Sequence, residues 1–429
     1  MKNIYKLIIA IALVSLYSCQ DAYEIKQVGL LEADNAVTNV DDMELNLLGA
    51  LGFLDNTAEI QFNGTYTDEL GIGDTNGGQN LEELGLVLNS GSGKPATIWS
   101  GNYIALNQIN RLIASSLSIT PTEDEMNRYK DVLGQAYAVR AFLHLTLQTY
   151  FSEDLTNNDA LGVIALDFAP KVDEFLPRNT NGEVFAVIEQ DLNAALENIQ
   201  DTGVIDSDVV KAIFARMYAY RGMYNEAVPY AQELLTSYPT VNQAGFTSMF
   251  TDTGAGDVIF RLERTIGDRY EEQGTGGGGY AGSLYSFVTA DIDGGLFLEM
   301  GRSLFNKIST ADVRFNSYVH PTSVIDPDYA TSPNYRDSDI LAINKYAGSE
   351  GQPLMNDLKL IRGAEMLFIL AEAGANGGSD LVGTAFGEEI YRAAGKPTTS
   401  SVDELATMVK EIGRVPAQRN THFGILKQF

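Results

Sequence analysis

The chain has 429 residues, a length that suggests one large domain or two domains in close contact. Hydrophobic residues make up 45% of it and charged residues 20%, which excludes an intrinsically disordered protein. The net charge of −28 excludes nucleic acid and anionic lipid headgroups as general partners, because an acidic surface repels them. Neutral ligands meet no such repulsion.

The first 19 residues have the pattern of a secretory signal. Lys2 and Lys6 precede an apolar run of about 10 residues, too short for a membrane-spanning helix, which needs ~20. The run ends at Leu-Tyr-Ser-Cys, which is similar to a bacterial lipobox. An ordinary signal peptide is the alternative, but Cys19 is the only cysteine and lies at the cut. We therefore predict a signal peptide over residues 1–18, lipidation of Cys19, and a soluble body held at a membrane by acyl chains such as palmitate.

Apolar residues at helical spacing predict the elements that follow. Residues 60–95 have the composition of loops and short elements, whereas 99–117 and 129–150 are expected to be helices. The second of these helices is apolar nearly all round and should be central. The run Thr180-Asn181-Gly182-Glu183 is typical of a capping box, and an apolar stripe follows it over 185–199.

Residues 209–239 contain the clearest repeat-like unit. Their small and aromatic side chains match the spacing of a tetratricopeptide hairpin, in which a proline ends the second helix. The matching residues are Ala215, Tyr218, Gly222, Tyr224, Ala227, Ala231, Leu234 and Pro239. The two helix pairs before this unit are interpreted as degenerate repeats, stacked so that each pair helps to bury the next.

The rest of the chain divides into an irregular segment and a helical end. Residues 241–345 are rich in Gly, Asp, Ser, Thr and Tyr, which indicates loops, short strands and short helices. Helical spacing resumes over 358–375, and two further helices are expected near 384–394 and 402–412.

Several short motifs occur in a fixed order between residues 95 and 375. No single motif is specific, but the ordered set behind a lipobox is. The motifs are Trp99-x3-Tyr103-x6-Asn110, Ala136-x3-Arg140-Ala141, Tyr150-Phe151, Pro177-Arg178, Ile188-x2-Asp191-Leu192-x2-Ala195, Ala212-x2-Ala215-Arg216-x-Tyr218, Ile259-Phe260 and Arg362-x-Ala364-Glu365-x5-Ala371-Glu372-Ala373. This order resembles the SusD/RagB family of outer-membrane nutrient-binding lipoproteins of Bacteroidetes.

The resemblance implies a mainly α fold, a tetratricopeptide-like helix-pair scaffold with an inserted, irregular, loop-rich lobe that carries the ligand site. It divides the mature chain into an N-terminal helical region over 19–239 and a C-terminal region over 240–429. It further implies an outer-membrane protein, lipid-anchored and facing the cell exterior, that passes glycans or other nutrients to a SusC-like TonB-dependent transporter. The acidic stretch after Cys19 looks like a surface-export signal. The family's usual C-terminal signature does not occur in 409–429.

Runs that could mark catalysis or metal binding lack the required context. Residues 274–279 follow acidic residues and not an apolar strand, so a dinucleotide site is not expected. Residues 91–95 lack the first glycine and the Ser/Thr of a phosphate loop. The three histidines have no ligand spacing, and the calcium-like run 74–83 misses the twelve-residue pattern. We expect no enzymatic activity and no cofactor, and calcium is not favoured.

Tyrosines in the irregular segments are the predicted ligand contacts, because a sugar needs a flat apolar face and partners for its hydroxyls. Neighbouring Asp, Asn and Arg side chains would supply polar contacts. The predicted contacts are Tyr66, Asp68, Asn76, Asn80, Tyr280, Tyr285 and Arg302, with Tyr346 as a further candidate. Two alternatives stay open: a surface glycoside hydrolase with a carboxylate pair, and an interaction subunit without a ligand of its own.

Overall fold

The computed structural model describes residues 37–54, 57–67, 69–73, 76–78, 80–171, 173–264, 296–307, 310, 315–328, 339–345 and 356–376. The signal peptide and the helices expected near 384–394 and 402–412 lie outside these residues. The boundary expected at 239/240 stays a prediction. Within the described part, no helix is long and apolar enough to cross a membrane.

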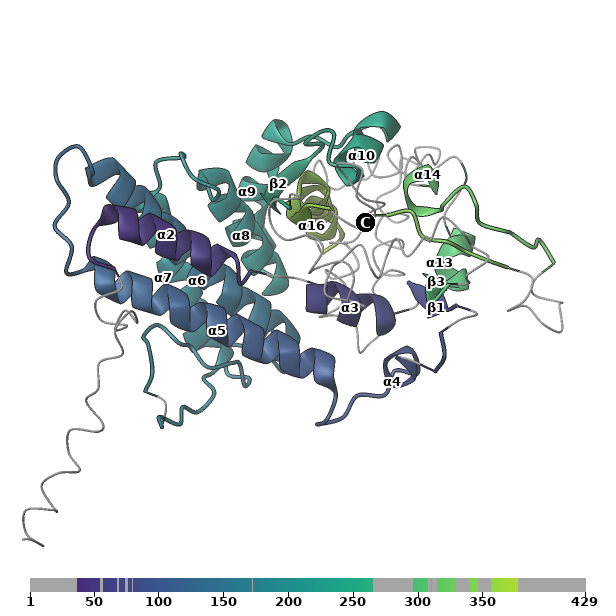
Figure 1. Cartoon of the computed structure of the whole chain (residues 1–429), viewed down its shortest axis with the longest axis horizontal. Coiled ribbons are helices and arrows are strands. Elements are labelled where there is room, and N and C mark those ends of the chain that lie inside the picture. The colour runs from purple at the N-terminus through teal and green to yellow at the C-terminus, as the bar shows by residue number, and fades with distance from the viewer. Residues whose placement is uncertain are drawn as a thin grey trace, which may run out of the picture.

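Stacked helices form most of the described structure, and the mainly α fold expected from the sequence is confirmed (Figure 1). Each helix packs on the next one along the chain from α5 to α9, α16 packs on α8 and α9, and α2 lies across α5 and α6. Their bounds are α2 Val40–Leu51, α5 Gly93–Ser116, α6 Met126–Phe151, α7 Asn181–Asn198, α8 Ser207–Tyr220, α9 Tyr224–Ser237 and α16 Gly363–Ala375.

Helix α6 is the centre of this stack, as its all-round apolar pattern predicts. Every residue from 131 to 149 is buried except Leu133 and Tyr137, which are half-buried. His144 is fully buried among them, and its Nε2 accepts a hydrogen bond from the Leu166 amide at 2.9 Å. Burial lowers the pKa of His144 to about 3, and the nearby Arg140 guanidinium adds to the shift, so the ring is neutral.

The helix ends follow the local sequence. Thr180 and Glu183 form the predicted capping box of α7, in which each side chain accepts a hydrogen bond from the other residue's amide. In the α8–α9 hairpin, Gly222 has a φ of 70°, which glycine adopts without strain. Ala227 is fully buried there, so the two helices approach closely. Helix α9 ends just before Pro239, as expected.

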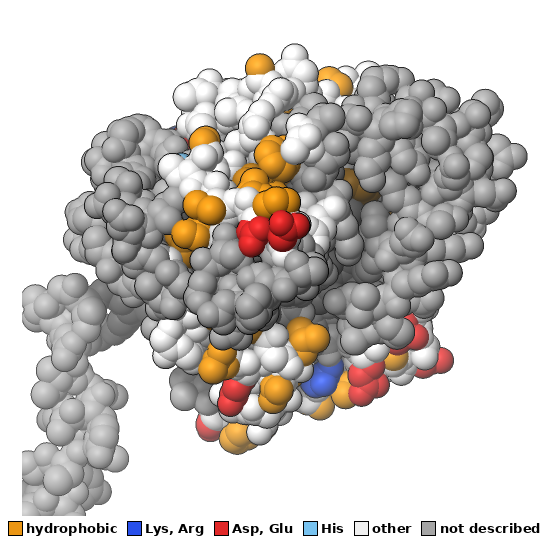
Figure 2. Space-filling model, turned by 90° about the vertical axis from the view of Figure 1, so that its right-hand side faces the viewer, with side chains coloured by type: hydrophobic (Ala, Val, Ile, Leu, Met, Phe, Trp, Pro, Cys, Tyr) orange, Lys and Arg blue, Asp and Glu red, His pale blue; other side chains and the backbone are white. Residues whose placement is uncertain are grey.

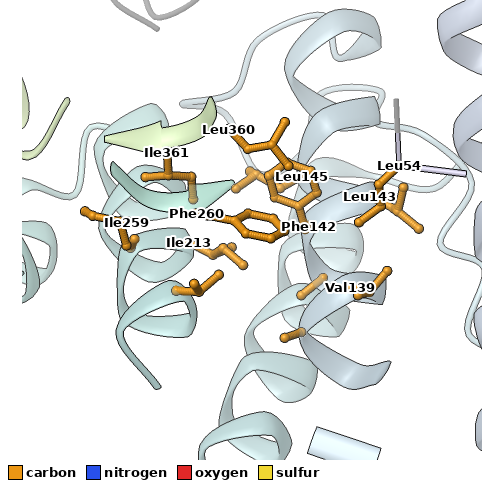
Figure 3. Packing of buried hydrophobic residues seen from close by; sticks show 14 of the residues in the cluster. Leu54, Val139, Phe142, Leu143, Leu145, Ile213, Ile259, Phe260, Leu360 and Ile361 are labelled. Carbon is orange, nitrogen blue, oxygen red and sulfur yellow. The ribbon is translucent and has the colours of Figure 1, made fainter. Parts of the chain in front are cut away.

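A two-stranded antiparallel sheet, β2 Val258–Leu262 with β4 Leu358–Arg362, closes one side of the helical core. The ring of Phe260 meets that of Phe142 on α6 edge to face, with centroids 5.7 Å apart (Figure 3). The prediction of a helix over 358–375 is therefore wrong for its first five residues, and the helix begins at Gly363. Those five residues form β4, because pairing with β2 buries all of them.

Gly363 marks the change from β4 to α16. A Cβ there would lie 2.0 Å from the Tyr238 carbonyl oxygen, so only glycine fits between the two segments. Its amide donates to the Asp257 carbonyl oxygen at 2.6 Å, and the Ala364 amide donates to the Asp257 carboxylate at 2.8 Å. Asp257 also pairs with Arg362 at 3.0 Å. An acidic side chain from a distant segment thus caps the first turn of α16.

The remaining short elements form a second lobe, at the right in Figure 1. Strands β1 and β3 pair antiparallel, with Leu70 opposite Met300, and so join two segments that are far apart in sequence. This lobe has the short helices and strands expected over 241–345, and 60–95 also contributes. The elements are α3 Thr57–Thr65, β1 Leu70–Ile72, α4 Leu81–Leu84, α10 Gln243–Phe250, β3 Leu298–Met300, α13 Arg302–Lys307 and α14 Phe315–Tyr318.

Two buried ion pairs connect the family-like motifs. Arg216 on α8 binds Glu365 on α16 through two hydrogen bonds of 2.6 Å, and each side chain is only 2% exposed. Arg140 on α6 binds Asp191 on α7 through hydrogen bonds of 2.8 and 2.6 Å. Such pairs must satisfy each other fully, because an unpaired buried charge is costly.

The Arg216–Glu365 pair predicts a large loss of stability when one partner is neutralised. Glu365→Gln leaves the Arg216 charge buried without its counter-charge, and we expect the free energy of unfolding to fall by ~3–5 kcal/mol. The urea-unfolding midpoint and slope of the purified protein measure this change. Glu44→Gln, which removes an exposed partner of Arg128, is the control and should leave the midpoint almost unchanged. Equal effects of the two substitutions would contradict the role of the buried pair.

The neutral His144 predicts a specific pH dependence of stability. Unfolding returns its pKa to ~6.5, so below that pH the unfolded state binds a proton that the folded state takes up only near pH 3. The contribution of His144 to stability is therefore intact above pH ~6.5 and falls by up to ~1.4 kcal/mol per pH unit below it. Urea unfolding at pH 5 and pH 7 should show a smaller pH effect in His144→Gln than in wild type. Parallel behaviour of both proteins would refute this assignment.

Candidate functional site

Two of the predicted contacts lie next to helix α4, which is at the lower right of Figure 1. Asn80 directly precedes α4, and Tyr66 contacts the segment that follows it. The chain reaches α4 from β1 through a turn with left-handed residues, in which Gly77, Gly78 and Asn80 have φ angles of 65°, 87° and 54°. Glycine and asparagine tolerate this conformation better than other residues. The turn therefore leads the chain from β1 into α4, which stays in contact with β1.

Tyr66 anchors the far end of the α4 segment. Its hydroxyl donates a short hydrogen bond to the Val87 carbonyl oxygen. Its ring stacks on Phe62 of α3, with centroids 4.6 Å apart. Burial, followed by the Glu83 charge, raises the pKa of Tyr66, so the hydroxyl stays protonated. Tyr66 thus has a structural contact and is only partly exposed.

Lys94, at the start of α5, anchors the near end. Its ammonium group donates to Asn80 Oδ1 at 2.7 Å and to Glu83 Oε1 at 3.0 Å. Burial is the largest influence on Glu83 and raises its pKa, but the hydrogen bond from Lys94, a backbone hydrogen bond and the Lys94 charge together lower the pKa below its usual value. The lysine of the rejected phosphate-loop run therefore has a partner within the protein.

Between these anchors the segment exposes an unusual run of apolar side chains. We call Leu81, Leu86, Val87 and Leu88 the α4 surface; each of them is at least half exposed. The acidic and amide groups of Glu82 and Asn89 lie beside them, joined at 3.4 Å. Hydrophobic and charged side chains lie next to one another on the lower part of the face in Figure 2. An apolar surface with hydrogen-bonding groups along it is typical of a binding site.

The other predicted contacts have different environments. Asn76 is only 2% exposed, and its Nδ2 donates to the Phe297 carbonyl oxygen at 2.9 Å, so it joins the two strands of the lobe from inside. Arg302 pairs with Asp339 and lies over the Phe305 ring, 5.0 Å from its centroid. The remaining predicted residues lie outside the described residues: Cys19, Asp68, Tyr280, Tyr285 and Tyr346.

The sequence did not single out the exposed run 86–88 or the anchoring role of Lys94 and Glu83. The run itself was the available signal, because three consecutive apolar residues in an Asn- and Gly-rich segment are unusual. The anchors had no such signal, because the contact between Lys94 and Glu83 depends on how α5 meets α4.

A separate pocket of about 140 Å³ lies between α3, α5, α6 and β4. Its walls are mostly apolar, and the Thr97 hydroxyl and the Asn102 amide already donate to carbonyl oxygens of their own helix. The lining residues are Phe53, Leu54, Ala58, Glu59, Thr97, Ile98, Gly101, Asn102, Phe142 and Leu360. Among the described residues, no three His, Cys, Asp or Glu side chains converge in a way that could hold a metal ion.

Comparison with known proteins finds a family match for part of the chain and solved structures with a similar fold. Residues 56–221 match a SusD-like family described as starch-binding and associating with the outer membrane. No curated protein sequence matches the chain.

Solved structures share the fold over most of their length. A SusD superfamily protein of Bacteroides thetaiotaomicron aligns with 91% of this chain and 87% of its own, at 19% identity and a TM-score of 0.69. A SusD-like carbohydrate-binding protein of Bacteroides vulgatus aligns with 91% of this chain and 83% of its own, at 19% identity and a TM-score of 0.68. A laminarin-binding SusD-like protein aligns with 90% of both chains, at 16% identity and a TM-score of 0.64.

The match over 56–221 includes the α4 surface and the helices from α5 to α8. The structural likeness then extends the same architecture over most of the chain. Residues 56–221 thus resemble a SusD-like family, and the chain as a whole shares the fold of these SusD-like structures.

Proposed function

We propose that this protein is a cell-surface lipoprotein that binds a glycan or similar nutrient and delivers it to a SusC-like TonB-dependent transporter. The observation that carries the proposal is the anchored, apolar α4 surface, which lies within the residues that match the SusD-like family. The lipobox-like Cys19 supports a lipid anchor, and the family description supports the outer membrane.

The chemistry of the α4 surface suits a neutral carbohydrate. Apolar side chains such as Leu81 and Leu88 can cover the C–H face of a sugar ring, and the groups of Glu82 and Asn89 can bind its hydroxyls. A neutral ligand also meets no repulsion from the net charge of −28. Two structural relatives are described as binding carbohydrate or laminarin, which supports glycans as the ligand class. Affinity should be modest, because ordering a flexible glycan offsets part of each contact.

The first experiment uses soluble protein that begins at Gln20. Affinity electrophoresis through a panel of polysaccharides measures binding, and the same mixtures are assayed for new reducing ends. We expect retardation by one glycan class without released ends. Released ends would favour a glycoside hydrolase acting through a carboxylate pair. Retardation by no glycan would contradict the proposed ligand class and favour an interaction subunit.

A pair of substitutions locates the binding site. Leu81→Ala with Leu88→Ala removes apolar area from the α4 surface, and we expect affinity for the retarding glycan to fall roughly tenfold, or ~1.4 kcal/mol. The melting temperature should stay within about a degree, because both side chains are exposed. Leu45→Ala with Leu48→Ala, a somewhat more exposed pair on α2, is the matched control and should keep wild-type affinity. Loss of affinity in the α2 pair alone would move the site away from α4.

A further inference from the structure

The connection between α6 and α7, residues 152–180, presents two phenylalanines to solvent. Phe168 is 43% exposed and Phe175 is 97% exposed. Burying a phenylalanine side chain is favourable, and the described fold leaves Phe175 almost wholly uncovered. In Figure 1 this connection runs beneath α5 at the lower left, whereas α4 lies beyond the right end of α5.

Buried side chains of α5 and α6 fix the backbone at Phe168. Asn110 Nδ2 donates to the carbonyl oxygens of Leu166 at 2.8 Å and of Phe168 at 2.9 Å. Arg140 Nη1 donates to the Asp167 carbonyl oxygen at 2.9 Å, and His144 accepts from the Leu166 amide. The Phe168 side chain therefore projects outward from a backbone that is held by the core.

Contacts on both sides also fix the position of Phe175. The Glu174 amide donates to the Lys171 carbonyl oxygen at 3.1 Å, and the Lys171 amide donates to the Glu174 carboxylate at 3.2 Å. On the other side, Arg178 donates to the carbonyl oxygens of Gly162 and Phe151, each at 2.5 Å. Exposed aromatic side chains on a fixed backbone lose little conformational entropy when a partner covers them.

We propose that Phe168 and Phe175 form a docking site for a protein partner that has an apolar socket with Lys or Arg at its rim. The socket would bury the two rings. The rim would face the exposed carboxylates of Asp167, Asp173 and Glu174, which outnumber the ammonium of Lys171. Exposed aromatic anchors beside complementary charges are typical of interface hot spots.

The charge of the chain selects this partner over two others. A second copy of the chain, with its own net charge of −28, would be repelled by the acidic loop. An anionic bilayer would repel the loop for the same reason. The inference rests on the proposed function for the identity of the partner, the SusC-like transporter. Asn110 of α5 holds the loop, whereas Lys94 at the start of α5 holds α4, so docking and glycan binding can be measured separately.

The test uses the full-length, affinity-tagged chain expressed in its native cells. After extraction in mild detergent, the transporter that co-purifies is quantified by mass spectrometry. We expect Phe168→Ala with Phe175→Ala to reduce its recovery at least tenfold, while glycan retention and the amount of protein at the cell surface stay at wild-type levels. Leu117→Ala with Val204→Ala, a similarly exposed pair, is the control and should retain the transporter.

A charge variant tests the second half of the proposal. Asp173→Lys with Glu174→Lys should also lower transporter recovery, and raising the salt concentration should weaken the wild-type complex. Wild-type recovery in the Phe168/Phe175 variant would overturn the docking site. So would a Phe-dependent dimer in sedimentation, or Phe-dependent flotation of the protein with phosphatidylcholine vesicles. If the wild-type protein binds glycan but no transporter co-purifies with it, the docking inference fails and the proposed glycan binding stands. If the transporter co-purifies but the protein binds no glycan, only the proposed ligand class fails.

Discussion

The buried pair of Arg216 and Glu365 is the constraint on which the arrangement of the two halves depends. It connects α8 to α16 across 149 positions, with two hydrogen bonds of 2.6 Å between side chains that are almost wholly buried. Arg216 also donates to the Leu360 carbonyl oxygen at 2.9 Å, so the same guanidinium holds β4. Taking both charges out of water is costly, and only this complete pairing offsets the cost. The pair therefore helps to fix the position of α16 and of the β2–β4 sheet, together with the packing of α16 on α9.

Buried ion pairs also hold the chain at two other places. Arg140 binds Asp191 with one edge of its guanidinium and a loop carbonyl with another atom. Asp257 both pairs with Arg362 and caps α16. Buried cations therefore orient long loops on a rigid helical frame. Loops held in this way can carry different binding side chains while the frame stays unchanged.

Helical periodicity was sufficient to predict α5 to α9, because their apolar stripes and caps are local features of the sequence. It was insufficient at Leu358–Arg362, where pairing with a distant strand overrides the helical spacing. Arg140, Arg216 and Glu365 belong to the sequence motifs that indicate a resemblance to the SusD/RagB family. Their pairings were not predicted, because partners 51 and 149 positions apart are set by helix packing.

The candidate site could be predicted only in part. Tyr66 and Asn80, chosen as ligand contacts, both hydrogen-bond within the α4 region, and their contact with a ligand stays a prediction. The same reasoning selected Asn76, which the turn buries against Phe297, because composition does not distinguish the inner from the outer side of a loop. The exposed leucines were missed, because apolar residues usually indicate a core and not a surface.

Hydrogen exchange of the soluble protein, with and without the glycan that retards it, tests the central claim most directly. If the ion-paired frame presents the α4 surface to the ligand, glycan should slow exchange of the amides in residues 80–94 and leave those of α6 unchanged. Protection confined to the pocket between α3 and α5, with none in residues 80–94, would contradict the account.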